Sequence, residues 1–213
     1  MKILKIDKTI AVADEVYMLS QKMHGFSKFA SNQPLNKTLV DLSNLLKNNI
    51  KWALCGGLAV GAYSNPRGTQ DIDIILESDN TIDTVVKLTQ VFFKRNRAHA
   101  LTHRQTGVEV DLVTPEFVKV EPAIVHAAIE TAHVFGFGGS IVPIVTKEGL
   151  VALKLCRASS YDIGDIESII RKNGEINLSQ YNLKDKEIKL FEDIKKRVSG
   201  EIIEKEEDFK QTY

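Results

Sequence analysis

Two aspartates separated by one residue stand in the segment Asp71-Ile72-Asp73-Ile74. This alternation predicts a β-strand over 71–76, with both carboxylates on one face and the isoleucines on the other. Two carboxylates held ~6–7 Å apart at their Cα atoms on a rigid strand repel each other. A divalent cation between them removes that repulsion, and oxygen ligands of this kind suit Mg²⁺ or Mn²⁺. Asp71 and Asp73 are therefore candidate metal ligands and catalytic residues.

A third acid, Asp111, has a similar setting. It lies in the alternating segment 108–113, where Glu109 shares its face by parity and apolar residues occupy the other. A neighbouring strand would bring Asp111 beside the first two aspartates. Three carboxylates can hold two metal ions that clamp an in-line phosphoryl displacement.

Gly56 and Gly57 stand between an apolar segment, 50–55, and a short helical one, 58–63. Glycines at a strand–helix junction let a phosphate approach the backbone, where the helix N-terminus presents free N–H groups. The pattern is not a Walker A loop, because no GxxxxGK[ST] occurs in the chain. Taken alone, such a pair of glycines is more often simply a turn.

In this order, Gly56-Gly57, the acidic pair and Asp111 resemble the nucleotidyltransferase superfamily of the DNA polymerase β type. Two further motifs are similar to one branch, the small bacterial abortive-infection nucleotidyltransferase toxins of type IV toxin–antitoxin systems. The first is Arg67-Gly-Thr69, just before the acidic pair, and the second is Lys154 followed by Asp162 and Asp165. The resemblance covers roughly residues 50–172.

The resemblance implies a role for each matching residue. The backbone of Gly56 and Gly57 would cradle the triphosphate, and Asp111 would bind one metal ion and help deprotonate the acceptor hydroxyl. The other implied nucleotide-binding residues are Arg67, Thr69, Lys154, Asp162 and Asp165. Among these, Lys154 would reach the phosphates, and the two aspartates would orient it or complete the pocket.

The resemblance thus predicts an enzyme that moves a nucleoside monophosphate from an NTP to an acceptor hydroxyl with Mg²⁺ or Mn²⁺. The acceptor would be an RNA end, a protein or a small molecule, and a toxin role would imply an antitoxin partner. The alternative is a catalytically degenerate module that binds a nucleotide or a partner. Gly57, where many members have Ser, and Ser159, where the branch often has Arg, favour that alternative.

Several of these residues have structural explanations as well. Lys154 can be a solvated lysine, and Asp162 and Asp165 can be acids that stabilise a helix N-terminus. The basic run 94–97 with Arg104 is typical of a solvated helix end, and a contact with RNA or nucleotide is its functional reading. The five histidines show no zinc-motif spacing.

Composition narrows the class of protein. The 213 residues carry 28 basic and 28 acidic side chains, and this balance argues against a generic polyanion binder. No apolar stretch approaches the ~18 residues of a membrane span, and the first residues lack the apolar core of a signal peptide. Cys55 and Cys156 lie in apolar contexts and are expected to be reduced, as in a cytoplasmic protein.

Hydrophobic periodicity predicts an α+β fold, with a nucleotidyltransferase-like mixed β-sheet flanked by helices and a C-terminal helical bundle. The expected divisions are N-terminal helices over 1–49, the core over 50–146, the bundle over 147–199 and a charged, frayed tail over 200–213. The expected helices are 11–24, 35–49 with Asn36 as cap, 58–63, 81–95, part of 115–128, 147–156, 162–172 and 184–197. The expected strands are 50–55, 71–76, 98–106, 108–113, 132–137 and 141–145.

Overall fold

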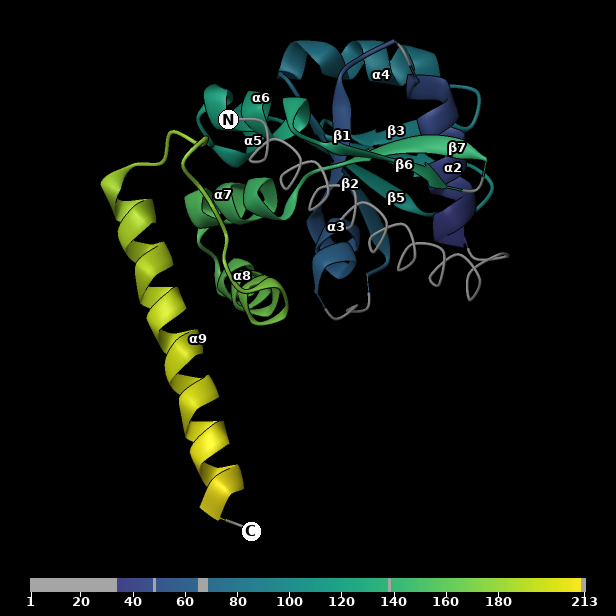
Figure 1. Ribbon diagram of the computed structural model, residues 1–213. Coiled ribbons are helices and arrows are strands. Elements are labelled where there is room, and N and C mark those ends of the chain that lie inside the picture. The colour runs from purple at the N-terminus through teal and green to yellow at the C-terminus, as the bar shows by residue number, and fades with distance from the viewer. Residues whose placement is uncertain (1–33, 48, 65–68, 138, 212–213) are drawn as a thin grey trace, which may run out of the picture.

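The computed structural model describes residues 34–47, 49–64, 69–137 and 139–211, with side chains up to residue 200 apart from Phe137. The expected helix over 11–24, the loop after it and the turn that contains Arg67 lie outside these residues. Within them, seven strands form one mixed sheet with helices on both faces (Figure 1). The predicted α+β fold is confirmed.

The sheet has the strand order β3-β4-β5-β2-β1-β7-β6. At its centre, β1 (Trp52–Cys55) runs antiparallel to β2 (Asp71–Leu76), and β2 runs parallel to β5 (Glu109–Val113). The outer strands are β3 (Phe93–Arg97), β4 (Ala100–His103), β6 (His133–Phe137) and β7 (Ser140–Ile144). The predicted hairpins over 98–113 and 132–145 are both present.

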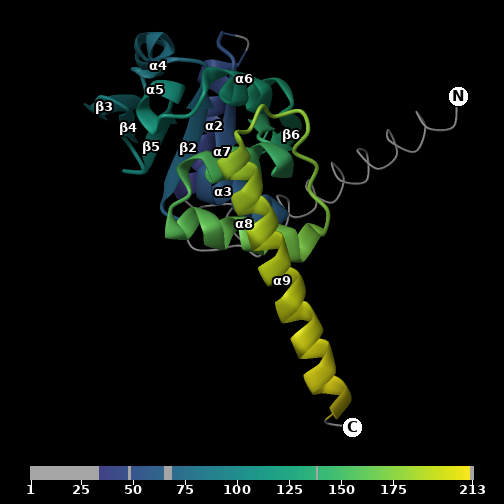
Figure 2. The same ribbon diagram turned by 90° about the vertical axis from the view of Figure 1, so that its left-hand side faces the viewer.

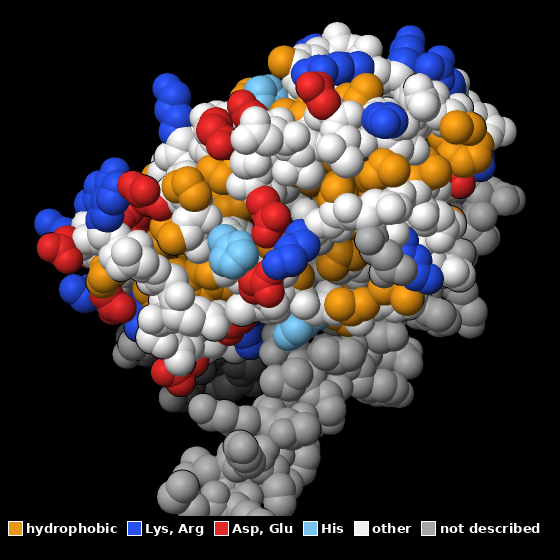
Figure 3. Space-filling view, turned by 90° about the horizontal axis from the view of Figure 1, so that it is seen from above, with side chains coloured by type: hydrophobic (Ala, Val, Ile, Leu, Met, Phe, Trp, Pro, Cys, Tyr) orange, Lys and Arg blue, Asp and Glu red, His pale blue; other side chains and the backbone are white. Residues whose placement is uncertain are grey.

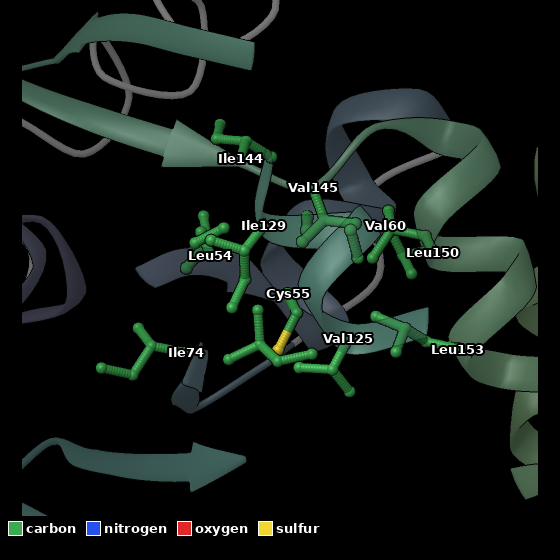
Figure 4. Packing of buried hydrophobic residues seen from close by; sticks show 14 of the residues in the cluster. Leu54, Cys55, Val60, Ile74, Val125, Ile129, Ile144, Val145, Leu150 and Leu153 are labelled. Carbon is green, nitrogen blue, oxygen red and sulfur yellow. The ribbon is translucent and has the colours of Figure 1, made fainter. Parts of the chain in front are cut away.

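Helices cover both faces of the sheet. On one face lie α2 (Pro34–Leu46), whose buried stripe includes Leu39, Leu42 and Leu46, and α4 (Ile82–Thr89), preceded by the short η1 (Asp79–Thr81). On the other face, α3 (Gly56–Tyr63) contacts β1 and β2, and α6 (Pro122–Glu130) follows α5 (Pro115–Val118). Residues from both helices meet β1 and α7 in the core, as Figure 4 shows around Cys55.

Three C-terminal helices pack on one another outside α3 and α6. They are α7 (Lys147–Arg157), α8 (Ser160–Asn173) and α9 (Asp185–Gln211). The first half of α9 packs through the buried side chains of Phe191, Ile194 and Val198. Figure 2 shows the second half of α9 extending beyond α7 and α8. The helix α9 continues through most of the predicted charged tail, to Gln211, and fraying of that tail stays a prediction.

The structure corrects several expected boundaries. The helix predicted over 81–95 ends at Thr89, and the basic run 94–97 belongs to the edge strand β3 instead of a helix end. The β3 sequence shows no alternation of apolar and polar residues, and only Phe93 is buried. The pairing with β4 therefore decides the conformation of this strand. Asn36 lies inside α2, and α3 begins at Gly56. No described helix is long and apolar enough to cross a membrane.

Candidate active site

Asp71, Asp73 and Asp111 meet on adjacent strands, and we call them the carboxylate cluster. In the parallel pair β2–β5, Asp73 lies opposite Asp111 and Asp71 opposite Glu109. Residues 72, 74, 110 and 112 are fully buried on the other face, so the apolar residues fix which face carries the acids. The sequence predicted the shared face, and the structure adds the pairing that joins the strands.

The carboxylate cluster concentrates negative charge in a partly buried place. Burial, together with the charges of Asp71 and Asp111, raises the pKa of Asp73 to about 6. Burial also raises the pKa of Asp111, with a further contribution from Asp71 and an opposing one from Arg97. Like charges held this close favour the binding of a cation, and carboxylate oxygens are ligands that suit Mg²⁺ or Mn²⁺.

Gly56 brings the first turn of α3 against Asp73. Its φ of +62° lies in the left-handed region, and a Cβ at this position would overlap the Asp73 carboxylate. Only glycine meets both conditions without displacement. The next residue, Gly57, donates its backbone N–H to Asp73 and lowers that residue's pKa. The glycines therefore place the N-terminus of α3 directly against the Asp73 carboxylate.

Thr69 contacts the acidic pair. Its hydroxyl donates to Asp71 Oδ1 at 2.6 Å, which fixes the orientation of that carboxylate. The resemblance implied a nucleotide-binding role for Thr69, and in the structure its described partner is Asp71. Arg67 lies outside the described residues, so its predicted role stays a prediction.

Lys154, Asp162 and Asp165 form a buried ion-pair group, which we call the lysine cluster. Lys154 Nζ lies 3.1 Å from Asp162 Oδ1 and 2.8 Å from Asp165 Oδ2. Burial opposes ionisation of Asp162, but hydrogen bonds from Ser159 and Lys154 and the charge of that lysine leave its pKa below the usual value. The charge of Lys154 also lowers the pKa of Asp73, which places the two clusters within electrostatic reach.

The start of α8 explains part of the lysine cluster. Ser159 is the N-cap, its hydroxyl accepts from the Asp162 N–H at 3.2 Å, and the Asp162 carboxylate accepts from the Ser159 N–H at 3.3 Å. This capping box fixes the first turn of the helix. Asp162 therefore has both the capping role and the lysine-orienting role that the sequence left open.

Arg97 is a site residue that the sequence analysis did not single out. It forms ion pairs with Glu109 and, at 3.5 Å, with Asp111. Its signal in the sequence is its place in the basic run 94–97, which predicted either a solvated helix end or a contact with RNA or nucleotide. Its reach to Asp111 depends on the β3–β4–β5 pairing, which the sequence does not display.

Comparison with solved structures identifies this architecture. A crystal structure of an antigenic nucleotidyltransferase-like protein from Paracoccidioides brasiliensis aligns with a TM-score of 0.52 and 20% identity, covering 83% of this chain and 90% of that chain. The chain has a nucleotidyltransferase-like fold. A crystal structure of ANT(2'')-Ia in complex with adenylyl-2''-tobramycin also aligns, at a TM-score of 0.45 and 10% identity over 79% of this chain and 98% of that chain. No protein-family model and no curated protein matches the sequence.

Within this nucleotidyltransferase-like fold, the carboxylate cluster, the start of α3 and the lysine cluster lie around one place. Asp73 connects the predicted residues, because Gly56 and Gly57 contact it, Asp111 pairs with it and the charge of Asp71 acts on it. The charge of Lys154, which is paired with Asp162 and Asp165, also acts on Asp73. Cys55 pairs with Asp73 across β1–β2, and burial, with the charge of Asp73, raises the pKa of its thiol well above the usual value.

Proposed function

We propose that this protein is a metal-dependent nucleotidyltransferase that moves a nucleoside monophosphate from an NTP to an acceptor hydroxyl. The pairing of Asp73 with Asp111 across β2–β5, with Asp71 on the same face, is the observation that carries the proposal. It assembles three carboxylates from two strands beside the N-terminus of a helix. Three acids in that arrangement suit the binding of metal ions and a polyphosphate.

The residues present fit divalent ions. Asp73 is half-buried beside two other carboxylates, so that its own ionisation is opposed, and a bound cation would offset this cost. Asp71, Asp73 and Asp111 would hold the ions. When bound, such ions stabilise the negative charge of the transferring phosphoryl group.

The protein's own groups would position the reactants. The N-terminus of α3 at Gly56 and Gly57 would face the phosphates with its backbone N–H groups, and Lys154 would add positive charge. Asp111 would accept the proton of the acceptor hydroxyl. A bond forms between that oxygen and the α-phosphorus. The bond between the α-phosphorus and the oxygen that bridges it to the β-phosphate breaks, and pyrophosphate leaves.

The acceptor and the biological role are part of the proposal. An RNA end, a protein hydroxyl and a small-molecule hydroxyl are the three acceptor classes to test. The motifs around Arg67 and Lys154 favour a toxin role with an antitoxin partner, on sequence resemblance alone. Induced expression in a bacterial host should then arrest growth, and an Asp73→Asn variant should not.

Incubation with each α-³²P-labelled NTP, Mg²⁺ or Mn²⁺, total RNA and cell extract tests the activity. We expect label on one acceptor class, and Asp73→Asn should reduce transfer by about 10³-fold, because several kcal/mol of charge stabilisation are lost. Asp185→Asn, which changes an exposed acid at the start of α9, is the matched control and should keep full activity. NTP binding without transfer to any acceptor, including added aminoglycosides, would overturn the proposal in favour of a binding module.

A further inference from the structure

A second group of ligand-type side chains lies at the other end of the β1–β2 pair. Glu77 directly follows β2, whereas Asp71 begins it, so the two residues are separated by about 20 Å along the strand. His126 and Glu130 lie one turn apart on α6, and Lys51 precedes β1. On the face seen in Figure 3, acidic, basic and histidine side chains lie among one another.

The three potential ligands are close enough to share one ion. One ligand atom from each of Glu77, His126 and Glu130 lies within 4.8 Å of the others. His126 Nδ1 is 3.4 Å from Glu77 Oε1. Tetrahedral coordination with bonds of about 2.0–2.1 Å separates neighbouring ligand atoms by about 3.3 Å. Small side-chain rotations therefore bring all three ligands to coordination distance.

Lys51 shows that these carboxylates already gather around a cation. Its ammonium contacts Glu130 and lies 3.9 Å from Glu77 Oε1. The hydrogen bond and charge of Lys51 lower the pKa of Glu130. The Lys51 side chain is 59% exposed, and ion pairs of this exposed kind add little to stability. A multivalent ion can therefore displace it at small cost.

We propose that Glu77, His126 and Glu130 form a binding site for Zn²⁺ or a similar transition-metal ion, with Lys51 as an internal competitor. The imidazole ligand distinguishes this site from the carboxylate cluster, because imidazole favours zinc whereas carboxylates alone favour Mg²⁺. A bound ion would join the end of β2 to the last turn of α6. The proposal is independent of the proposed transferase activity.

Calorimetric titration of the full chain with Zn²⁺, in the presence of excess Mg²⁺ to occupy the carboxylate cluster, tests the site. We expect His126→Ala to weaken zinc binding by about tenfold or more, since even indirect ligand changes cost that much in metal sites. Lys51→Ala should tighten it, because the competing cation is gone. Glu121→Gln breaks the exposed Lys184–Glu121 ion pair at the start of the same helix and should leave zinc affinity unchanged.

A second measurement, of Tm, distinguishes loss of zinc binding at this site from a folding defect and from zinc binding at the carboxylate cluster. Zinc should raise the Tm of the wild type and of Asp73→Asn, but not that of His126→Ala. Equal zinc affinity in wild type and His126→Ala would overturn the proposal, as would unchanged affinity in Lys51→Ala. Zinc binding that is lost in Asp73→Asn and kept in His126→Ala would place the ion at the carboxylate cluster instead, and would also overturn it.

Discussion

The carboxylate cluster and the lysine cluster differ in the charges that surround their acidic side chains. In the first, Asp71 and Asp111 stand near Asp73, and burial with their charge raises its pKa to about 6. In the second, the ammonium of Lys154 sits between Asp162 and Asp165 at hydrogen-bond distance. In the lysine cluster, Lys154 and Arg157, whose Nε lies 3.5 Å from Asp162 Oδ2, supply the compensating charge from within the chain. In the carboxylate cluster, Arg97 pairs with Asp111, but Asp73 remains beside like charges, so that under the proposed function a metal ion would supply the compensating charge.

Lys154→Met should give the largest effect on folding. It leaves the carboxylates of Asp162 and Asp165 buried without their shared cation, and breaking a buried pair in this way costs about 3–5 kcal/mol. Urea unfolding measures the loss. The triple variant with Asp162→Asn and Asp165→Asn should recover most of it, and a full loss in the triple variant would mean that packing, not charge, dominates the lysine cluster.

Asp73→Asn should do the reverse and stabilise the protein. The pKa of Asp73 is raised from 3.8 to about 6, so the folded state binds its proton more tightly than the unfolded state does. The wild type should therefore lose stability, relative to Asp73→Asn, as pH rises from about 4 through 6, by at most about 3 kcal/mol. Unfolding free energies of both proteins across this range check the prediction.

The same titration separates the two clusters. Asp162 has a lowered pKa, so its contribution to stability is present above its unfolded pKa and is lost as pH falls through its folded pKa. An Asp162→Asn comparison should therefore show a pH slope of opposite sign to that of Asp73→Asn. Slopes of the same sign would remove the contrast between the clusters.

Gly56→Ala should disturb the carboxylate cluster from the helix side. The left-handed φ alone costs about 1–2 kcal/mol for a residue with a Cβ, and the new methyl group must also displace the Asp73 carboxylate. Gly164→Ala is the matched control, because a methyl group added at this position in α8 meets nothing within 4 Å. It should instead stabilise the protein by about 0.5–1 kcal/mol. Thermal unfolding and the transfer assay measure both.

Thr69→Val should have the smallest effect. It removes one hydrogen bond to Asp71, worth about 1 kcal/mol, so that transfer should fall by about fivefold. Thr69→Ser keeps the hydroxyl and should restore activity. A loss as large as that of Asp73→Asn would indicate that Thr69 contacts the nucleotide directly, as the family resemblance implied.

The sequence by itself determined the local features of this site. Alternation over 71–74 and 109–112 put each acid on one face and Ile72, Ile74, Val110 and Leu112 on a buried one, since side chains alternate across a strand. It also predicted the fold class and both hairpins, and the family resemblance implied the association of Lys154 with the two downstream acids. These features depend on residues close together in the chain or on motifs of fixed spacing.

Only the tertiary structure decided which residues from distant parts of the sequence contact one another at the site. Asp111 reaches Asp73 because β2 and β5 pair in parallel, and Arg97 reaches Asp111 because β3 forms the sheet edge instead of extending α4. The left-handed φ of Gly56 follows from its position against Asp73. The grouping of Glu77 with α6 also joins distant segments. Long-range pairing and packing choose among conformations that local sequence leaves nearly equal in energy, so spacing alone does not reveal these contacts.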